Sequence, residues 1–341
     1  MVSSEAQALE DLRIGILGAS SVAEYAVIEP STRRTGITVV GLGSRDPAAA
    51  ADYARRLSIA RVTSYDELIA DPHVEAVYVG LPNALHAEWT IRALEAGKSV
   101  LCEKPLASNA AEARAMFAAA ASQRLLLMEA LHWRWHPLAR MVAETVGAGR
   151  LGTIREASAR FLIPGRGEPW AQGFRSKYAL GGGAAMDAGA YCLDFLRYVL
   201  GEPLGVRWAR AVEAARQVDE EMEAELAFAG GAVGRLHVSH VHDGPYVIDA
   251  EIRGEKGAMR IQNPFLPHWG HRVELKIEGV AQAVECDLTP TYDFQARGFA
   301  AAARGEGDNL SPPANSLANM RAMDALYEAA GLRIRGLKGS G

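Results

Sequence analysis

Residues 13–23 read RIGILGASSVA, a short apolar run followed by a glycine-containing turn and the start of a helix. A second such run, SVLCEKPLASN at residues 99–109, places Lys104 directly after a strand. Between them, apolar runs at 37–42 and 74–80 alternate with helical segments of about ten residues. Strands that alternate with helices predict right-handed βαβ units and a parallel sheet. Such sheets bind ligands at the carboxyl ends of their strands, which is where we expect Lys104.

The pattern changes after Glu129, where longer stretches alternate between apolar and polar residues and predict an antiparallel or mixed sheet. We expect these strands at residues 154–163, 205–211, 221–229, 234–241, 246–254, 272–278 and 282–287. The predicted fold class is α/β, with an N-terminal Rossmann parallel sheet in residues 1–130. Residues 131–341 would form an α+β domain with a large open, mostly antiparallel sheet, whose last helices can pack back on the first domain.

The composition is that of an ordinary globular protein, with 49% hydrophobic and 23% charged residues. A net charge of −5 argues against a nucleic-acid or membrane-surface partner, and the apolar stretches are too short or too polar to span a bilayer. Cys102, Cys192 and Cys286 are spaced too widely for a disulfide framework or a zinc site, which favours a reducing cytoplasm. The first residues carry acids and no apolar core, so we expect no signal peptide.

The turn GASSVA at residues 18–23 keeps the first glycine and the final small residue of the GxGxxG/A dinucleotide fingerprint. Ser20 stands at the middle glycine position, where its Cβ would hold the backbone slightly further from a phosphate. Such a turn aims backbone N–H groups and a helix N-terminus at a pyrophosphate. We therefore predict cofactor contacts from Gly18, Ser20, Ser21 and Val22. A tight turn without nucleotide is the alternative.

The end of the second strand, GSRD at residues 43–46, indicates which dinucleotide binds. An acidic residue directly after the strand would bond the ribose 2′-hydroxyl of NAD(H). Instead, Ser44 can donate a hydrogen bond to a 2′-phosphate, and Arg45 can pair with that charge and stack on adenine. We therefore favour NADP(H) as the cofactor and leave NAD(H) open. In the alternative reading, Arg45 is a solvated surface arginine, and Asp46 caps a helix in either case.

Two further groups of candidate cofactor-binding residues follow strands whose carboxyl ends we expect to border the ligand crevice. Leu81, Asn83 and His86 follow one strand, where their polar atoms can reach the ribose or the nicotinamide. Asn83 is equally suited to cap the next helix. Glu103 and Lys104 follow another strand, and we count both among the cofactor-binding residues.

In combination, these motifs resemble the glucose–fructose oxidoreductase / inositol dehydrogenase / MocA-like family. The resemblance covers nearly the whole chain, through residues 18–23, 43–47, 65–107, 136–155, 181–196 and 252–265. It implies a nicotinamide-binding domain and an α/β domain with an open sheet. In that family the open sheet often forms oligomer contacts, so the resemblance implies a homodimer or homotetramer.

The glycine-rich segment 181–191 carries two candidate catalytic residues. In a helix that starts near residue 186, Asp187 and Tyr191 share a face. Tyr191 stands where the inositol dehydrogenase branch has histidine, and so resembles the glucose–fructose oxidoreductase and dihydrodiol/xylose dehydrogenase branch. A nearby Lys104 ammonium would favour the Tyr191 phenolate and stabilise a developing alkoxide. We expect Lys104 and Tyr191 to handle the proton and Asp187 to orient substrate; a capping aspartate and a structural tyrosine are the alternatives.

Further aromatic residues and arginines predict contacts with cofactor and substrate. Trp133 and Arg134 match an aromatic–arginine element that the resemblance places near the nicotinamide pocket. Arg134 can contact cofactor or a substrate oxygen, and Trp133 or Trp135 can pack against a sugar. Trp170, Arg175 and Tyr178 precede the glycines and suit a substrate-binding loop. Packing at a domain junction or at the surface is the alternative for each.

His237, His240 and His242 raise the question of a metal site. On a strand, His240 and His242 share a face and His237 lies on the other. No acidic residue has suitable spacing along the chain, so we interpret the three as sheet or interface residues and predict no metal.

The residues together predict an NADP(H)-dependent oxidoreductase that transfers a hydride to or from a secondary alcohol or carbonyl of a sugar, cyclic polyol or related ring alcohol. Two alternatives remain open. The resemblance also covers NAD-dependent glycosidases that use transient oxidation, and a third possibility is a non-catalytic NAD(P)-sensing regulator.

Overall fold

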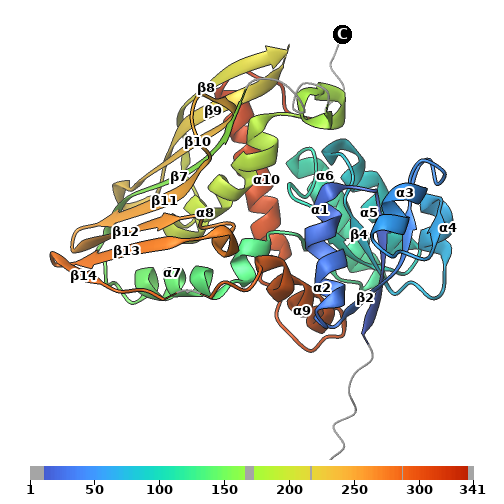
Figure 1. Ribbon diagram of the computed structural model, residues 1–341. Coiled ribbons are helices and arrows are strands. Elements are labelled where there is room, and N and C mark those ends of the chain that lie inside the picture. Colours follow the sequence, from blue (N-terminus) through green and yellow to red (C-terminus); the bar gives the residue numbers. More distant parts are fainter. Residues whose placement is uncertain (1–10, 166–172, 216, 286, 337–341) are drawn as a thin grey trace, which may run out of the picture.

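The computed structural model describes residues 11–165, 173–215, 217–285 and 287–336, which form two sheets with helices around and between them (Figure 1). The first sheet has six parallel strands in the order β3-β2-β1-β4-β5-β6. They are β1 (Leu12–Leu17), β2 (Ile37–Gly43), β3 (Val62–Thr63), β4 (Ala76–Val79), β5 (Ser99–Cys102) and β6 (Leu127–Glu129). Among the helices that connect them are α3 (Ala51–Arg56), α4 (Tyr65–Ala70), α5 (His86–Glu95) and α6 (Ala110–Gln123). The predicted Rossmann parallel sheet is confirmed.

The strand order places a ligand crevice between β1 and β4. The chain moves outward from β1 to β3 and then returns to build β4 to β6 on the other side, so the direction reverses between β1 and β4. Open α/β sheets bind ligands at this reversal, outside the carboxyl ends of the strands. Both strands are buried on both faces, as parallel strands covered by helices are: the neighbours Ile16 and Leu17 are fully buried, and so is all of β4.

The helix after β1 is irregular. It runs to residue 32 as α1 (Ser21–Ala23), a π-helical segment (Glu24–Ile28) and α2 (Glu29–Thr32). Pro30 lies in this run and has no N–H to donate, so an unbroken α-helical ladder cannot pass through it.

The segment after β6 is not one continuous helix. It forms a 3₁₀ turn (His132–Trp135) and then α7 (Pro137–Gly147). His136 between them is extended, with ψ 143°, because the ring of Pro137 disfavours a helical residue before it. The break separates His132 from α7 and leaves it beside the crevice edge of the first sheet.

The second sheet has eight strands in the order β14-β13-β12-β11-β7-β10-β9-β8, and only the β7–β10 pair is parallel among the described pairings. Its strands are β7 (Ile154–Pro164), β8 (Gly205–Ala215), β9 (Val218–Ala227), β10 (Val233–His242), β11 (Val247–Gly254), β12 (Gly257–Gln262), β13 (Arg272–Ile277) and β14 (Val280–Gln282). The predicted large, mostly antiparallel sheet is confirmed.

The two faces of the second sheet have opposite character. Ala159 and Val238 are buried on the face that packs against α8 (Ala190–Leu200). The outer face carries ion pairs instead, such as Arg160 Nε to Asp249 Oδ1 at 2.8 Å. Figure 1 shows α8 and α10 on the side toward the first sheet and no described helix over the outer face. The outer face is therefore the open one.

The C-terminal helices α9 (Thr291–Ala303) and α10 (Pro313–Ala329) tie the two sheets together (Figure 1). Arg33, at the end of α2, forms an ion pair with Asp293 of α9 at 2.7 Å. Asp324 of α10 accepts a hydrogen bond from the first N–H of α6 at 3.0 Å. Among the described residues, no helix is long and apolar enough to cross a membrane.

A buried ion pair anchors the end of the described chain beneath the glycine-rich segment. Arg335 and Asp219 have no exposed side-chain area and lie 2.8 Å apart. The other carboxylate oxygen of Asp219 accepts the Ala185 N–H at 2.7 Å. Gly183 has φ +136°, and a Cβ there would lie 2.2 Å from Asp219 Oδ1, so only glycine fits at this position.

We predict that Asp219→Ala lowers the free energy of unfolding by about 3–5 kcal/mol, because it leaves the Arg335 guanidinium buried without a counter-charge. The matched control is Asp249→Ala, which breaks the exposed pair with Arg160 and should cost about 0–1 kcal/mol. Urea unfolding followed by circular dichroism measures both variants. Equal losses in the two variants would show that the Asp219 pair contributes no more than a surface pair.

Candidate active site

The turn after β1 packs its backbone against the end of β4. Gly18 has φ +101°, and a Cβ there would lie 2.7 Å from the carbonyl oxygen of Gly80. Ser20 caps the helix that follows, because its Oγ accepts the N–H of Ala23 at 3.3 Å. The first N–H groups of a helix have no partner within it, so this end can bind a phosphate. The predicted pyrophosphate-binding residues lie here: Gly18, Ser20, Ser21 and Val22.

The residues predicted to select NADP(H) follow β2. Ser44 Oγ accepts the backbone N–H of Asp46 at 3.2 Å, which forms a tight turn. Asp46 caps the next turn, as expected, by accepting the Ala49 N–H at 3.0 Å. Arg45 is exposed, and no carboxylate of the described residues pairs with it. Its guanidinium is therefore available to an anionic ligand.

Asn83 and His86 hold loops together around the crevice. Asn83 Nδ2 donates to the Gly181 carbonyl at 2.8 Å, which joins the loop after β4 to the glycine-rich segment. The His86 ring lies between the carbonyl oxygens of Leu81 and Pro105, at 2.8 and 2.9 Å. Both side chains are buried, so their polar groups contact the protein itself. The structure gives them a positioning role that the sequence did not predict.

Glu103 supports the loop that carries Lys104. One carboxylate oxygen accepts the Tyr78 hydroxyl at 2.9 Å, and the other accepts the Lys104 N–H at 3.1 Å. Burial raises the pKa of Glu103. The carboxyl group therefore fixes the backbone at Lys104 from inside the protein.

Lys104 reaches across to the segment before α8. Its Nζ donates to both the backbone oxygen and Oδ1 of Asp187, each at 2.9 Å. The Nζ also lies 4.9 Å from the centre of the Tyr191 ring, a cation–π contact. Asp187 belongs to a π-helical segment (Ala185–Gly189) rather than to the α-helix predicted from residue 186. The three predicted catalytic residues nevertheless come together.

Asp187 is the centre of a partly buried charge cluster. Besides Lys104, it binds Arg175 Nε at 2.7 Å and His240 Nε2 at 3.1 Å, both through Oδ2. Burial by itself would raise the pKa of Asp187, but the charges of Lys104 and Arg175 hold it well below the usual value. Asp187 is therefore an anion that fixes two cations.

His240 was expected to be a sheet or interface residue on the face opposite His237, and it is a residue of strand β10. Three positions along a strand reverse the direction of the side chain, so the two histidines lie on opposite faces. The sequence did not predict the contact of His240 with Asp187. His240 lies buried on the inner face, against Asp187, while His237 lies on the outer face.

Tyr191 is buried in an aromatic cluster and bonds a histidine that the sequence did not single out. Its hydroxyl lies 2.8 Å from His132 Nε2, and His132 Nδ1 lies 2.7 Å from Thr291 Oγ1. Phe265 stacks on the Tyr191 ring at 5.4 Å between centroids. Since Glu129 ends β6, the strand-end rule that selected Lys104 also applies to His132, three positions further on.

The ionisation of Tyr191 differs from the expectation that Lys104 would favour the phenolate. Burial raises the pKa of Tyr191 well above 10.0, and Tyr292 and Glu103 add to this. The ammonium of Lys104 lies over the ring and is paired with Asp187, so it does not offset the burial. Tyr191 is a protonated phenol and a hydrogen-bond donor.

Trp133 and Arg134 are engaged with Asp194 rather than with the Lys104 cluster. The Trp133 indole N–H donates to Asp194 at 2.9 Å, and Arg134 binds the same carboxylate with two nitrogens at 2.8 Å. Trp133 is buried. These contacts agree with the alternative, packing at a domain junction, and contact of either residue with cofactor or substrate stays a prediction.

Of the three candidate substrate-binding residues in the loop before the glycines, the structure describes Arg175 and Tyr178. Arg175 reaches Asp187, whereas the Tyr178 hydroxyl donates to the Ile334 carbonyl at 2.9 Å. Trp170 lies outside the described residues, so its predicted substrate contact stays a prediction.

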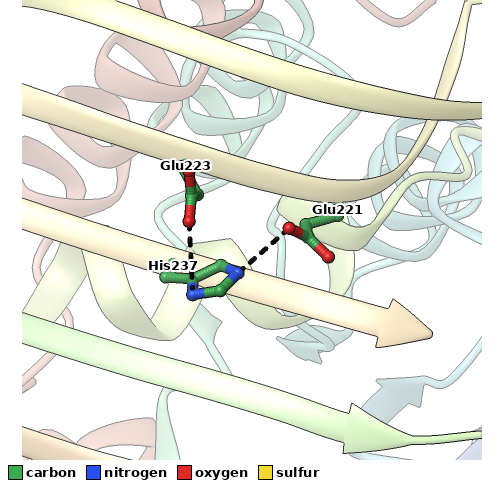
Figure 2. Close-up of side chains that lie close together, drawn as sticks. All are labelled: Glu221, Glu223 and His237. Atoms are coloured by element: carbon green, nitrogen blue, oxygen red, sulfur yellow. Dashed lines mark ion pairs between the residues drawn. The ribbon is translucent and has the colours of Figure 1, made fainter. Parts of the chain in front are cut away.

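On the outer face of the second sheet, His237 lies between Glu221 and Glu223 (Figure 2). The sequence suggested no acidic partner, but antiparallel pairing of β9 with β10 places Glu223 directly opposite His237. Glu221 faces Nε2 at 3.3 Å, and Glu223 faces Nδ1 at 3.6 Å. Because each glutamate faces a different ring nitrogen, this orientation suits an ion-pair bridge better than a shared metal ion.

The same outer face is hollowed by a volume of about 920 Å³. Trp208 and Tyr246 line it and are 45% and 58% exposed. Charged side chains line the rest, including Arg160, Asp249 and Arg235. This hollow lies across the sheet from Asp187 and α8, so it belongs to a surface rather than to the Lys104 cluster.

Comparison with known proteins agrees with this arrangement. Residues 12–131 match the model of the oxidoreductase family with an NAD-binding Rossmann fold, and residues 139–260 match the GFO/IDH/MocA C-terminal domain. The chain belongs to the GFO/IDH/MocA oxidoreductase family. The predicted resemblance is thereby confirmed.

Two curated members of the GFO/IDH/MocA family align over nearly their full length. A dTDP-3,4-didehydro-2,6-dideoxy-alpha-D-glucose 3-reductase of Saccharopolyspora spinosa is 33% identical, covering 94% of this chain and 96% of its own. A D-xylose 1-dehydrogenase (NADP(+)) of Haloferax volcanii is 32% identical, covering 94% and 97%.

A solved GFO/IDH/MocA-type structure is also similar. The 3-ketoreductase from Actinomadura kijaniata, in complex with NADP and TDP-benzene, has a TM-score of 0.84 and 29% identity and covers 94% of this chain and 98% of its own. Related structures of that enzyme carry a lysine-to-alanine or a tyrosine-to-phenylalanine substitution.

Proposed function

We propose that the protein is an NADP(H)-dependent oxidoreductase that transfers a hydride to or from a secondary alcohol or carbonyl of a sugar, cyclic polyol or related ring alcohol. The observation that carries this proposal is the contact of Lys104 with Asp187 and Tyr191 at the carboxyl edge of the parallel sheet. Relatives of similar length reduce dTDP-linked keto sugars or oxidise xylose, which supports the substrate class.

The residues that would hold the cofactor fit an NADP(H) molecule. The backbone at Gly18 leaves no room for a Cβ, as expected of a turn that a pyrophosphate approaches. The exposed Arg45, without a carboxylate partner among the described residues, supports recognition of a 2′-phosphate. A bound nicotinamide supplies the hydride, and the protein orients the reacting groups.

In this proposal, Tyr191 supplies the proton when a carbonyl is reduced. Its phenol is protonated because burial raises its pKa. The ammonium of Lys104, fixed by Asp187, stabilises negative charge that develops on the substrate oxygen. Arg175, 43% exposed in its side chain and paired with Asp187, is placed to bind substrate hydroxyls. Asp187 thus orients Lys104 and Arg175, and through them the substrate.

We also propose that the protein works in the cytoplasm as a homodimer or homotetramer that uses the open face of the second sheet. Cys102 and Cys192 are buried free thiols, which fits a reducing compartment. No described helix covers the outer face (Figure 1). Trp208 and Tyr246 line the hollow on this face and are exposed.

We predict that Arg45→Ala raises the dissociation constant for NADPH by about ten- to a hundredfold, because it removes a charge-assisted contact to the 2′-phosphate. Binding of NADH should change by less than about twofold, since NADH lacks that phosphate. Nicotinamide fluorescence measures both constants, with Arg140→Ala on α7 as an exposed-arginine control. An equal increase in the dissociation constants of NADPH and NADH would show that Arg45 does not bind the 2′-phosphate.

We predict that Tyr191→Phe lowers the rate of carbonyl reduction by about 10²–10⁴-fold and leaves NADPH binding intact, because the proton donor is lost. Since the pKa of Tyr191 is raised, the phenol stays protonated and active as pH rises through the normal range of tyrosine. The wild-type rate of reduction should therefore show no decline from Tyr191 below about pH 10. A kcat profile with saturating NADPH and a keto-sugar checks this, and a decline centred near neutral pH would contradict it.

A further inference from the structure

A hydrogen-bonded chain of three buried groups leads away from the Tyr191 hydroxyl. Tyr191 lies on α8, His132 on the 3₁₀ turn after β6 and Thr291 at the start of α9. The Tyr191 oxygen is 2.8 Å from His132 Nε2, and His132 Nδ1 is 2.7 Å from Thr291 Oγ1. His132 is 1% exposed and Thr291 is fully buried. Three elements that are distant in the sequence therefore form one hydrogen-bonded chain that ends at the Tyr191 hydroxyl group.

The His132 ring is neutral in this setting. The Tyr292 ring lies 4.1 Å away between centroids, and the titratable groups that face His132 include His268, Lys104 and His136. Burial, with these groups nearby, lowers the pKa of His132 well below its usual value. A neutral imidazole carries one hydrogen, so one ring nitrogen donates and the other accepts.

Thr291 determines which nitrogen carries that hydrogen. Within the described part of the chain, the only hydrogen-bond partner of the Thr291 hydroxyl is His132 Nδ1. Both the Thr291 and the Tyr191 hydroxyls contact His132, but Thr291 is fully buried whereas Tyr191 is 6% exposed and faces the substrate in the proposed function. A fully buried hydroxyl needs a protein acceptor for its hydrogen, so we assign Thr291 as the donor and Nδ1 as the acceptor. The ring hydrogen is then on Nε2 and points at the Tyr191 oxygen. The phenolic hydrogen of Tyr191 is left free to point toward a substrate.

We propose that His132 is a positioning residue for Tyr191, and that Thr291 fixes it as the Nε2–H tautomer. This inference rests on the proposed function and deepens it. Nε2–H donates to the Tyr191 oxygen, so the phenolic hydrogen faces the substrate. When the Tyr191 O–H bond breaks and its proton forms a new O–H bond on the substrate oxygen, the phenolate keeps the Nε2–H bond. The proton on Nε2 stays there, and water returns a proton to Tyr191 after product leaves.

The direction of the hydrogen bonds is tested by the tautomer of His132 in the intact protein. Long-range ¹H–¹⁵N NMR distinguishes Nε2–H from Nδ1–H imidazole, and the His132 signal is the one lost in His132→Gln. The proposal expects a single Nε2–H tautomer at neutral pH. An Nδ1–H tautomer, or a doubly protonated ring, would overturn it.

The effect on Tyr191 is tested with Thr291→Val, which removes the hydroxyl and keeps the side-chain shape. Without the Thr291 hydrogen bond the tautomer is no longer fixed, so kcat for carbonyl reduction should fall about tenfold while KM and NADPH binding stay within about twofold. Thr291→Ser should restore kcat. Thr145→Val on α7 makes the same change at another buried threonine and should leave kcat unchanged.

An unchanged kcat in Thr291→Val, or an equal loss in Thr145→Val, would overturn the positioning role. The two claims can fail separately. A wild-type protein that binds NADPH but reduces no keto-sugar would refute the proposed function. The NMR measurement needs no turnover, so it tests the direction of the hydrogen bonds independently of that result.

Discussion

The ion pair between Lys104 and Asp187 is the interaction on which the rest of the site depends. It joins the loop after β5, in the parallel sheet, to the π-helical segment before α8, which packs under the second sheet. The two side chains are 11% and 16% exposed, so little water shares the charges. Removing Asp187 would leave the largely buried Lys104 charge without its counter-charge. The site can form only where both halves of the protein meet.

Several other polar groups lie around this ion pair because they bind or position its two partners. Asp187 holds two cations and a histidine, and Glu103 fixes the backbone of Lys104 from the opposite side. The glycine-rich segment makes room for this arrangement, because a Cβ at Gly182 would lie 2.3 Å from the Arg175 carbonyl oxygen. The strand-end loop, the glycines and the π-helical turn therefore act together to place Lys104 beside Tyr191.

The sequence predicted those parts of the site that follow from strand ends and short spacings. Lys104 was predictable because the carboxyl ends of parallel strands meet at one edge. Asp187 and Tyr191 were predictable from their spacing, although the helix is partly π-helical. Both sheets were predictable from the change from alternating strands and helices to longer alternating strands.

Contacts between distant segments were not predictable. His132 and Thr291 are 159 residues apart, and only the packing of α9 brings them together. His240 lies on the inner face of β10, as strand alternation predicts, but its contact with Asp187 depends on how the π-helical segment packs against that strand. Arg134 binds Asp194, 60 residues further along the chain, and no motif indicates this contact. In each case the partner is chosen by tertiary packing, which a motif does not contain.

The most direct test of the account is a single-turnover measurement with Lys104→Ala. Oxidation of bound NADPH by a keto-sugar is followed by nicotinamide absorbance, and NADPH affinity and urea unfolding are measured on the same sample. The account predicts a rate at least about 10²-fold lower, with NADPH binding within about threefold of wild type. A variant that is folded and reduces the substrate at the wild-type rate would contradict it. So would a folded variant that no longer binds NADPH, because Lys104 would then serve the cofactor rather than the reaction.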